Sequence, residues 1–179
     1  VIHGCRESFM STGAVKLSPV AVDDNALCLQ QELNWLARCI ELRLHSYFQQ
    51  QSVNLLQQAE PPQLSAAQGS YATFVFRQQL SATERLIVLL ALAPHLQPQL
   101  LDSFFVRNDN LGRSFTEFGG CSTKQHSGFL PSAETAAFLL TGNDLTSRLQ
   151  LMQLLQPEQR LRRPKLRKWP LKRHQRLET

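Results

Sequence analysis

The sequence predicts a mainly α, α+β fold in which a long N-terminal helix precedes a winged-helix-like domain with a small β-hairpin. Three observations predict this fold. Apolar residues recur with helical period over residues 25–58, a capping box at Ser81 opens a strongly apolar segment, and glycines interrupt an aromatic-rich stretch at 113–130. The 179 residues suffice for one compact domain with appendages, and their apolar content of 42% can supply its core.

The composition divides the chain into five segments. These are a flexible lead-in (1–22), an N-terminal helical segment (23–60), a linker (61–70), a winged-helix-like helical domain (71–157) and a basic tail (158–179). Residues 1–9 precede the Met at position 10, so the sequence leaves open whether they belong to the native chain. They are not used to predict the fold.

The first helix is expected over residues 25–58. Asp23 and Asp24 offer N-caps, and no Gly or Pro interrupts the pattern before Pro61. Its apolar residues form one core-facing stripe: Leu29, Leu33, Leu36, Ile40, Leu44, Tyr47 and Phe48. The Pro- and Ser-containing stretch that follows is a linker by composition.

The next elements are a short extended segment and a central helix. Residues 71–77 (YATFVFR) combine β-branched and aromatic side chains, which favours a short strand or an extended lead-in. Ser81 and Glu84 then form a capping box, in which each side chain accepts from a free backbone amide. The helix that they open is apolar on nearly all sides, so we expect it to be buried. Pro94 is expected to end it, and Pro98 suits the first turn of the next helix.

The C-terminal part continues with turns and two helices. Residues 108–112 (NDNLG) have turn chemistry. A helix with the sequence SAETAAFLL follows Pro131, and Gly142 is expected to provide its left-handed C-cap. Asn143 is expected to cap a last amphipathic helix. The apolar positions of that helix share one face: Leu145, Leu149, Met152 and Leu155.

The stretch at 113–130 is predicted to be a β-hairpin or a long structured loop between two helices. Its glycines let the backbone turn tightly, and its phenylalanines can pin it to the core. Glu117 would share a face with Phe115 in an extended chain; a structural role is favoured for it, then an interface, then catalysis. The candidate partner interface comprises Phe115, Glu117, Phe118, Gly119, Gly120, Gly128 and Phe129.

The same stretch shows no complete catalytic or cofactor motif. A phosphate-binding loop needs its Lys before the Ser or Thr and a helix directly after it, whereas residues 119–124 (GGCSTK) have the reverse order. Cys121 and His126 lack an orienting carboxylate for a nucleophilic pair and further ligands for zinc. We therefore expect no catalytic residue, metal or cofactor in this chain, and a hydrolase based on Cys121 is the least favoured class.

Charge and cysteine content limit the possible partners. Residues 1–157 have a net charge of −2 and residues 158–179 one of +7, so the high pI belongs to the tail. A nearly neutral body argues against a broad basic face for nucleic acid. The four cysteines show no close spacing, which favours a reducing, cytoplasmic compartment. The longest apolar run, residues 86–94, is far shorter than the roughly 20 residues of a membrane helix.

Three segments resemble a known family. They are LSATERLIVLLALAPHLQPQLLDSFF (80–105), GRSFTEFGG (112–120) and HSGFLPSAETAAFLLTGNDLTSRLQLM (126–152). They resemble, in this order, the N-terminal region of bacterial AAA+ ATPases that are encoded with phage-tail-like contractile injection systems. The resemblance covers about residues 24–156. The tail differs from the family's pattern, in which an apolar, strand-like segment is expected, so the end of the chain could come from truncation or a frameshift.

The resemblance implies a non-catalytic accessory domain that precedes an ATPase module. ATP and Mg²⁺ are expected only for that module, whose motifs this chain lacks. Its expected partners are its own AAA+ module and an injection-system protein, and oligomers are expected only of the full-length form. The alternative is a free-standing winged-helix regulator that binds nucleic acid. The segments PQLLDSFFV and SAETAAFLL, the candidate recognition helices, contain no Lys or Arg, which argues against this alternative. The cationic tail with Trp169 is a less favoured nucleic-acid site.

Overall fold

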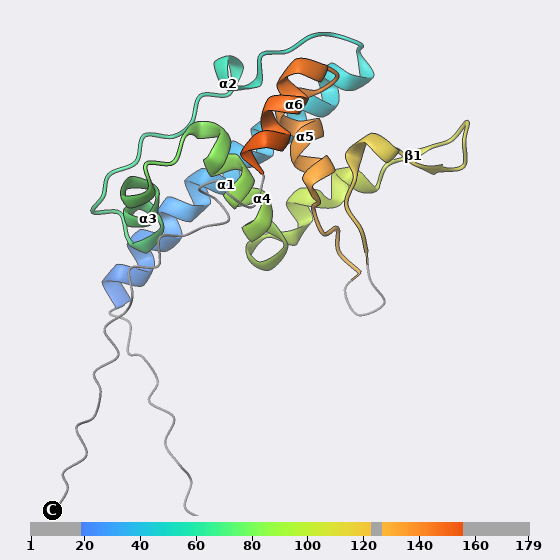
Figure 1. Ribbon diagram of the computed structural model, residues 1–179. Helices are drawn as coiled ribbons and strands as arrows, with labels where there is room; N and C mark the ends of the chain where they lie inside the picture. The colour runs from blue at the N-terminus through green and yellow to red at the C-terminus, as the bar shows by residue number, and fades with distance from the viewer. Residues whose placement is uncertain (1–18, 123–126, 156–179) are drawn as a thin grey trace, which may run out of the picture.

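The computed structural model describes residues 19–122 and 127–155. In these ranges the chain is mainly helical and has one small antiparallel sheet, which confirms the predicted class (Figure 1). The elements are α1 (Pro19–Phe48), α2 (Leu55–Gln58), α3 (Ser70–Gln78), α4 (Ala82–Leu96), η1 (Pro98–Phe105), β1 (Arg107–Asn108), β2 (Arg113–Ser114), η2 (Thr116–Phe118), α5 (Ala133–Thr141) and α6 (Leu145–Leu154). Most of the predicted lead-in and the whole basic tail lie outside the described residues.

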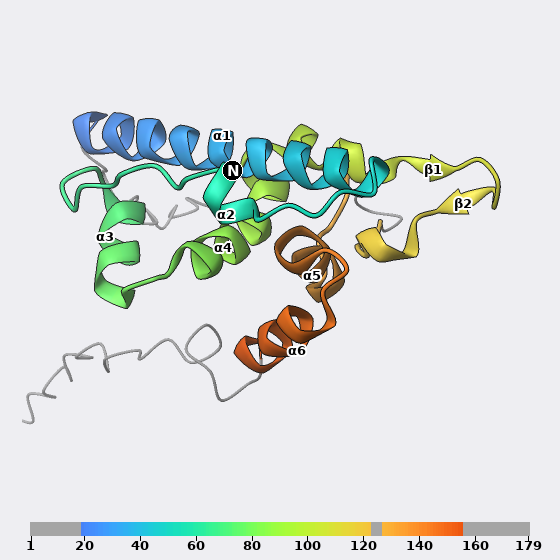
Figure 2. The same cartoon turned by 90° about the horizontal axis from the view of Figure 1, so that it is seen from above.

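Helix α1 is the long element against which α3, α4 and α5 pack (Figures 1 and 2). Its apolar stripe is buried around Leu33, Leu36 and Ile40, as predicted. The predicted ends are wrong. The helix already includes Asp23 and Asp24, so neither is its N-cap. It ends at Phe48 rather than near residue 58, because the backbone turns at residues 49–51 with a positive φ of 53° at Gln50.

Residues 71–77 form a helix and not the predicted strand. Tyr71, Ala72 and Val75 of α3 are buried against α1, a spacing that a helix presents on one face. The Oδ1 atom of Asn25 in α1 accepts hydrogen bonds from the Tyr71 amide (2.9 Å) and the Ser70 hydroxyl (3.2 Å). This contact satisfies a free amide of the first turn. Tertiary packing thus overrides the β-propensity of the segment.

Helix α4 is the central buried helix that the sequence predicts. The Ser81–Glu84 capping box is present in both directions. Leu86 and Leu89 are fully buried. Pro94 does not end the helix as predicted, since α4 continues to Leu96. Pro94 has no N–H to donate to the carbonyl of Leu90, so the helix loses one backbone hydrogen bond there and ends two residues later.

The regular hairpin lies at residues 107–114 and not in the glycine-rich stretch. β1 and β2 pair antiparallel over two residues each, with Asn108 opposite Arg113. The Asn108 side chain closes the turn by accepting from the amides of Asn110 (3.1 Å) and Leu111 (3.3 Å). Figure 2 shows this hairpin extending past the end of α1.

In its described residues the glycine-rich stretch is a long loop, which was one of the two predictions. After η2, an isolated antiparallel bridge joins Cys121 to Leu130, with N–O distances of 3.0 and 2.9 Å. Residues 123–126 of this loop lie outside the described residues. Among the described residues that follow η2, the predicted hairpin is therefore reduced to this one bridge.

Three details predicted for α6 and for the turn that precedes it are wrong. Gly142 has a positive φ of 56°, but its ψ of −124° lies outside the left-handed helical region. Asp144 rather than Asn143 caps α6, and its carboxylate accepts from the Ser147 amide (2.8 Å). The predicted apolar face of α6 is largely in solvent: Leu145, Leu149 and Met152 are 67%, 55% and 45% exposed.

A buried polar network joins α1, α3 and α4. The Glu32 carboxylate is fully buried and accepts from the Tyr71 hydroxyl (2.7 Å) and from Arg85 Nε (3.2 Å). Arg85 also forms an ion pair with Glu32, donates to the Pro62 carbonyl (3.0 Å), and places its guanidinium 5.1 Å from the Trp35 ring centre. Burial and the Glu32 carboxylate raise the pKa of Tyr71. Within the described ranges no helix is long and apolar enough to cross a membrane.

Candidate functional site

The aromatic residues of the predicted interface divide into buried and half-exposed side chains. Phe118 is 1% and Phe129 5% exposed. Phe118 lies 4.7 Å from the Phe138 ring centre, and Phe129 stacks on Phe104 at 5.1 Å. The prediction that these rings pin the loop to the core is confirmed. Their burial also means that neither ring offers a surface to a partner, so their role is to position the loop.

The glycines of the predicted interface allow close packing beneath the loop. Gly119 and Gly120 have φ values of 60° and 74°, which favour glycine. A Cβ on Gly120 would lie 2.2 Å from the Phe129 ring, and one on Gly119 would lie 2.5 Å from Glu134 Cβ. The Gly120 amide donates to the Ser132 hydroxyl (3.0 Å), which ties the loop to the start of α5. Gly128 is half-buried at a bend before the aromatic anchor.

The exposed part of the predicted interface meets the end of α1. The Tyr47 ring centre lies 5.3 Å from Phe48 and 5.8 Å from Phe115, and Phe48 and Phe115 are 5.6 Å apart. The Tyr47 hydroxyl donates to Glu117 (3.2 Å), and Phe48 is 49% exposed. Burial and then Glu117 raise the pKa of Tyr47. We call this group the aromatic edge: Tyr47, Phe48, Phe115 and Glu117.

Half of the aromatic edge was not predicted as a site. Tyr47 and Glu117 are separated by 70 residues, so no local pattern could join them. The periodicity placed Phe48 in the core stripe, but the helix ends there and leaves the ring half in solvent. The relevant signal was the run of four polar residues directly after Phe48, QQQS at 49–52, which interrupts the stripe.

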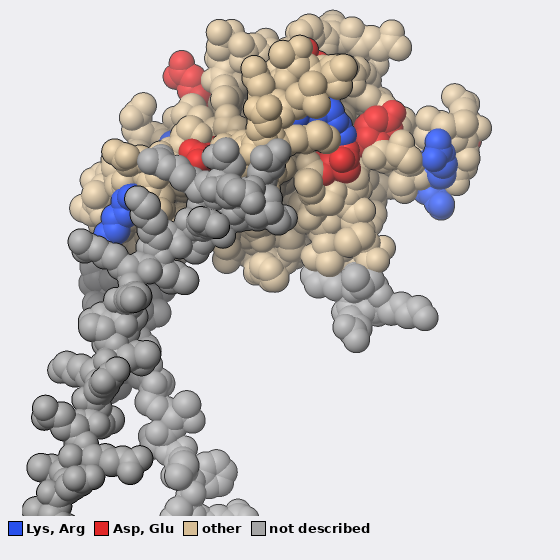
Figure 3. All heavy atoms as spheres, viewed as in Figure 1, with Lys and Arg blue, Asp and Glu red and all other residues tan. Residues whose placement is uncertain are grey.

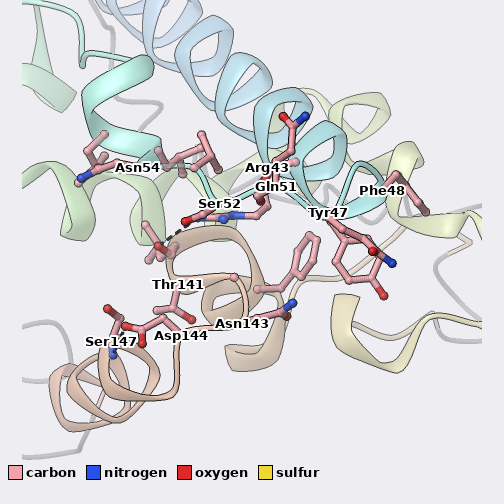
Figure 4. Close-up of a pocket in the computed structure, with 18 residues that line it drawn as sticks. Arg43, Tyr47, Phe48, Gln51, Ser52, Asn54, Thr141, Asn143, Asp144 and Ser147 are labelled. Atoms are coloured by element: carbon pink, nitrogen blue, oxygen red, sulfur yellow. Dashed lines mark hydrogen bonds between the residues drawn. The ribbon is translucent and has the colours of Figure 1, made fainter.

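Phe48 lies between two hollows. The polar hollow, about 980 Å³, separates the end of α1 and residues 49–54 from the α5–α6 turn (Figure 4). The apolar hollow, about 350 Å³, lies between α1 and η1 and is lined by Ile40, Leu44 and Leu100. Phe48 lines both. A partner that covers Phe48 would therefore find concave surface on either side of an aromatic ring.

The reactive side chains of the described residues give no second candidate site. Cys28 and Cys39 are buried, as expected of small core residues, and burial raises the pKa of Cys39 to about 12. Cys121 is exposed, and its predicted neighbour His126 lies outside the described residues, as does Lys124. In the part of the chain that the structure describes, no three His, Cys, Asp or Glu side chains are grouped for a metal.

Charged side chains are sparse on the face shown in Figure 3. Arg107 and Arg113 on the hairpin are both exposed. Arg148 and Glu134 form a partly exposed ion pair between α6 and α5, which contributes little to stability. No family model, curated protein or solved structure matches this chain. Its function therefore has to be inferred from the residues themselves.

Proposed function

We propose that this chain is a non-catalytic accessory domain that binds a partner for the AAA+ ATPase of a contractile injection system. The observation that carries the binding role is the aromatic edge, in which a half-exposed Phe48 lies between two hollows and the neighbouring Tyr47 bonds to the Glu117 carboxylate. Energetically dominant interface residues are typically aromatic side chains that become buried within a polar rim. The AAA+ context comes from the resemblance of residues 80–152 to that family.

The winged-helix-like description belongs to this proposal. α3, α4 and η1 are followed by the β1–β2 hairpin, which is the order of three helices and a wing. α1 and the α5–α6 pair are additions to that order. The expected partners are the chain's own AAA+ module and an injection-system protein in the cytoplasm, with ATP and Mg²⁺ bound by the motor module alone.

The test compares two phenylalanines of equal exposure. Phe48 at the aromatic edge is 49% exposed, and Phe76 on α3 is 48% exposed. Binding of the 179-residue chain to a purified AAA+ module encoded with an injection system in the same genome is measured by calorimetry. Phe48→Ser should weaken binding by about 2 kcal/mol, or roughly 30-fold, as for a hot-spot residue. Phe76→Ser should leave binding unchanged.

Two results would contradict the proposal. One is equal binding by wild type and both variants. The other is ATP turnover by the purified chain alone that survives removal of contaminating ATPases. Equal binding would show that the aromatic edge is not the partner-binding surface, and ATP turnover would show that the chain is not a non-catalytic domain.

One observation favours the nucleic-acid alternative. The hairpin in the position of a wing has exposed arginines at 107 and 113. Each phosphate contact that a cation makes contributes about one unit to the salt dependence of log K. If the hairpin binds DNA, the double variant Arg107→Ser/Arg113→Ser should reduce this slope by about two in a fluorescence-anisotropy titration of the full chain with duplex DNA. An unchanged slope assigns any DNA binding to the tail.

A further inference from the structure

The fold contains two buried arginines with different partners. Arg85 is 9% exposed and is neutralised by the Glu32 carboxylate. Arg43 is 6% exposed, yet among the described residues no carboxylate forms an ion pair with it. Burying a charge without a counter-charge is costly, and desolvation accordingly lowers the pKa of Arg43. Arg43 is therefore a largely buried cation without a carboxylate partner among the described residues.

The hydrogen bonds of Arg43 account for only part of its guanidinium. Nε donates to the Leu139 carbonyl (2.8 Å), and Nη2 lies 3.5 Å from the Leu140 carbonyl. Both carbonyls belong to the last turn of α5, where a cation complements the helix dipole. Nη1 donates to no acceptor in the described residues. It lies beside Gly142, where an added Cβ would be only 2.7 Å away.

Arg43 and Gly142 both line the polar hollow. Figure 4 shows Arg43, Gln51 and Ser52 on one side and Thr141, Asn143 and Asp144 on the other. Arg43 is the one cation and Asp144 the one acid among the described residues of this lining. The Asp144 carboxylate is already engaged in capping α6.

Neutral donors complete the lining. The side chains of Ser52, Asn54 and Asn143 make no hydrogen bond within the described residues, so they are available to a ligand. A guanidinium with neutral hydrogen-bond donors around it is the usual way in which proteins bind carboxylate and phosphate oxygens.

We propose that the polar hollow is a binding site for an oxyanion, carboxylate or phosphate, with Arg43 Nη1 as its charged donor and Asn143 and Ser52 as neutral donors. The bound oxyanion would provide the negative charge that no described carboxylate provides to Arg43. This inference is independent of the proposed function, because it rests on the polar hollow and Arg43 and not on the aromatic edge or the AAA+ context.

The experiment is an NMR titration of the 179-residue chain with sodium phosphate and, separately, with sodium acetate. Because the Arg43 Nε–H group is hydrogen-bonded, its resonance should be protected from exchange and visible, and Arg43→Lys assigns it. A saturable shift is expected for at least one anion below about 20 mM. Saturation in this range requires a dissociation constant near 1 mM, which corresponds to a binding free energy of only about 4 kcal/mol. Sodium chloride at matched ionic strength should cause no saturable shift.

Variants separate site binding from general charge effects. Arg43→Gln should weaken binding at least tenfold, by the loss of about 1.5–3 kcal/mol of charge-assisted hydrogen bonding, as read from the Asn143 amide. Arg38→Gln removes an exposed arginine from the same helix and should leave the affinity unchanged. Asp144→Asn keeps an equally good N-cap but removes the one acid, so it should tighten binding about two- to fivefold.

The outcomes distinguish the source of the oxyanion. Saturation by phosphate alone indicates a phosphorylated ligand, and saturation by acetate alone indicates an acidic side chain or a chain terminus. Shifts that never saturate, or saturable binding that survives in Arg43→Gln, overturn the proposal. If circular dichroism shows that Arg43→Gln is unfolded, the wild-type chain and Asp144→Asn provide the test. The proposal is overturned if the wild-type shifts do not saturate, or if Asp144→Asn does not bind the anion more tightly than the wild type.

Discussion

Replacing Phe118 by alanine should destabilise the whole fold, although the residue lies in a loop-rich segment. The ring is 1% exposed and contacts Phe104, Phe115 and Phe138 at centroid distances of 5.8, 5.0 and 4.7 Å. A buried aromatic side chain removes about 150–250 Å² from water, which at about 25 cal/mol per Å² corresponds to about 4–6 kcal/mol. Truncations of this kind cost about 3–5 kcal/mol, because the cavity relaxes only in part.

Urea unfolding followed by tryptophan fluorescence and far-UV circular dichroism measures this loss. The loss is a large share of the roughly 5–15 kcal/mol that stabilises a typical domain. Phe118→Leu, which keeps most of the volume, should cost about 1–2 kcal/mol and remains measurable if the alanine variant is unfolded. Phe76→Ala, half-exposed on α3, is the control and should cost less than about 1 kcal/mol. A Phe118→Ala loss below about 1 kcal/mol would refute the reasoning, because the loop could then not be pinned by this ring.

Three further predictions concern the core and its turns. Glu32→Gln should cost about 3–5 kcal/mol in urea unfolding, since it leaves Arg85 buried and unpaired, and adding Arg85→Met should recover much of that loss. Gly120→Ala should destabilise by more than Gly112→Ala, because both have positive φ but only the first new methyl meets an aromatic ring; equal losses in thermal unfolding would contradict this. The raised pKa of Cys39, about 12 against 9.0 for an ordinary thiol, keeps the folded thiol protonated while the unfolded one ionises. Stability should therefore be unaffected below pH 9 and fall between pH 9 and 12, and the Cys39→Ala variant should lack this part of the fall.

Local chemistry in the sequence predicted the starts of α4 and η1, although not those of α1 and α6. The capping box at Ser81 and the proline at the start of η1 lie where predicted, because each depends on residues within one turn of the chain. Predictions that depended on propensity alone failed where a distant residue intervened. The segment expected to be a strand at 71–77 is a helix, and Asn25 on another helix accepts from the Tyr71 amide and the Ser70 hydroxyl in its first turn.

The candidate site was predictable only in its supporting half. The aromatic and glycine residues of 115–129 predicted a loop that is pinned to the core, and the burial of Phe118 and Phe129 confirms this. The exposed half was not predictable because Tyr47 bonds to Glu117, 70 residues away in the sequence, and Phe48 packs against Phe115. The same limit applies to α6, whose period predicts an apolar face but cannot tell whether the fold covers it.

The division between buried and exposed aromatic residues makes the two roles separable by experiment. A Phe118 variant should lose partner binding only in proportion to its unfolded fraction, because its ring never reaches the surface. A Phe48 variant should lose binding while its free energy of unfolding changes little, because half of its ring is already in solvent. Plotting binding free energy against unfolding free energy for both variants therefore separates the support of the loop from the surface that a partner would cover. If both variants and the wild type fall on one line, the aromatic edge acts through stability alone and the partner binds elsewhere.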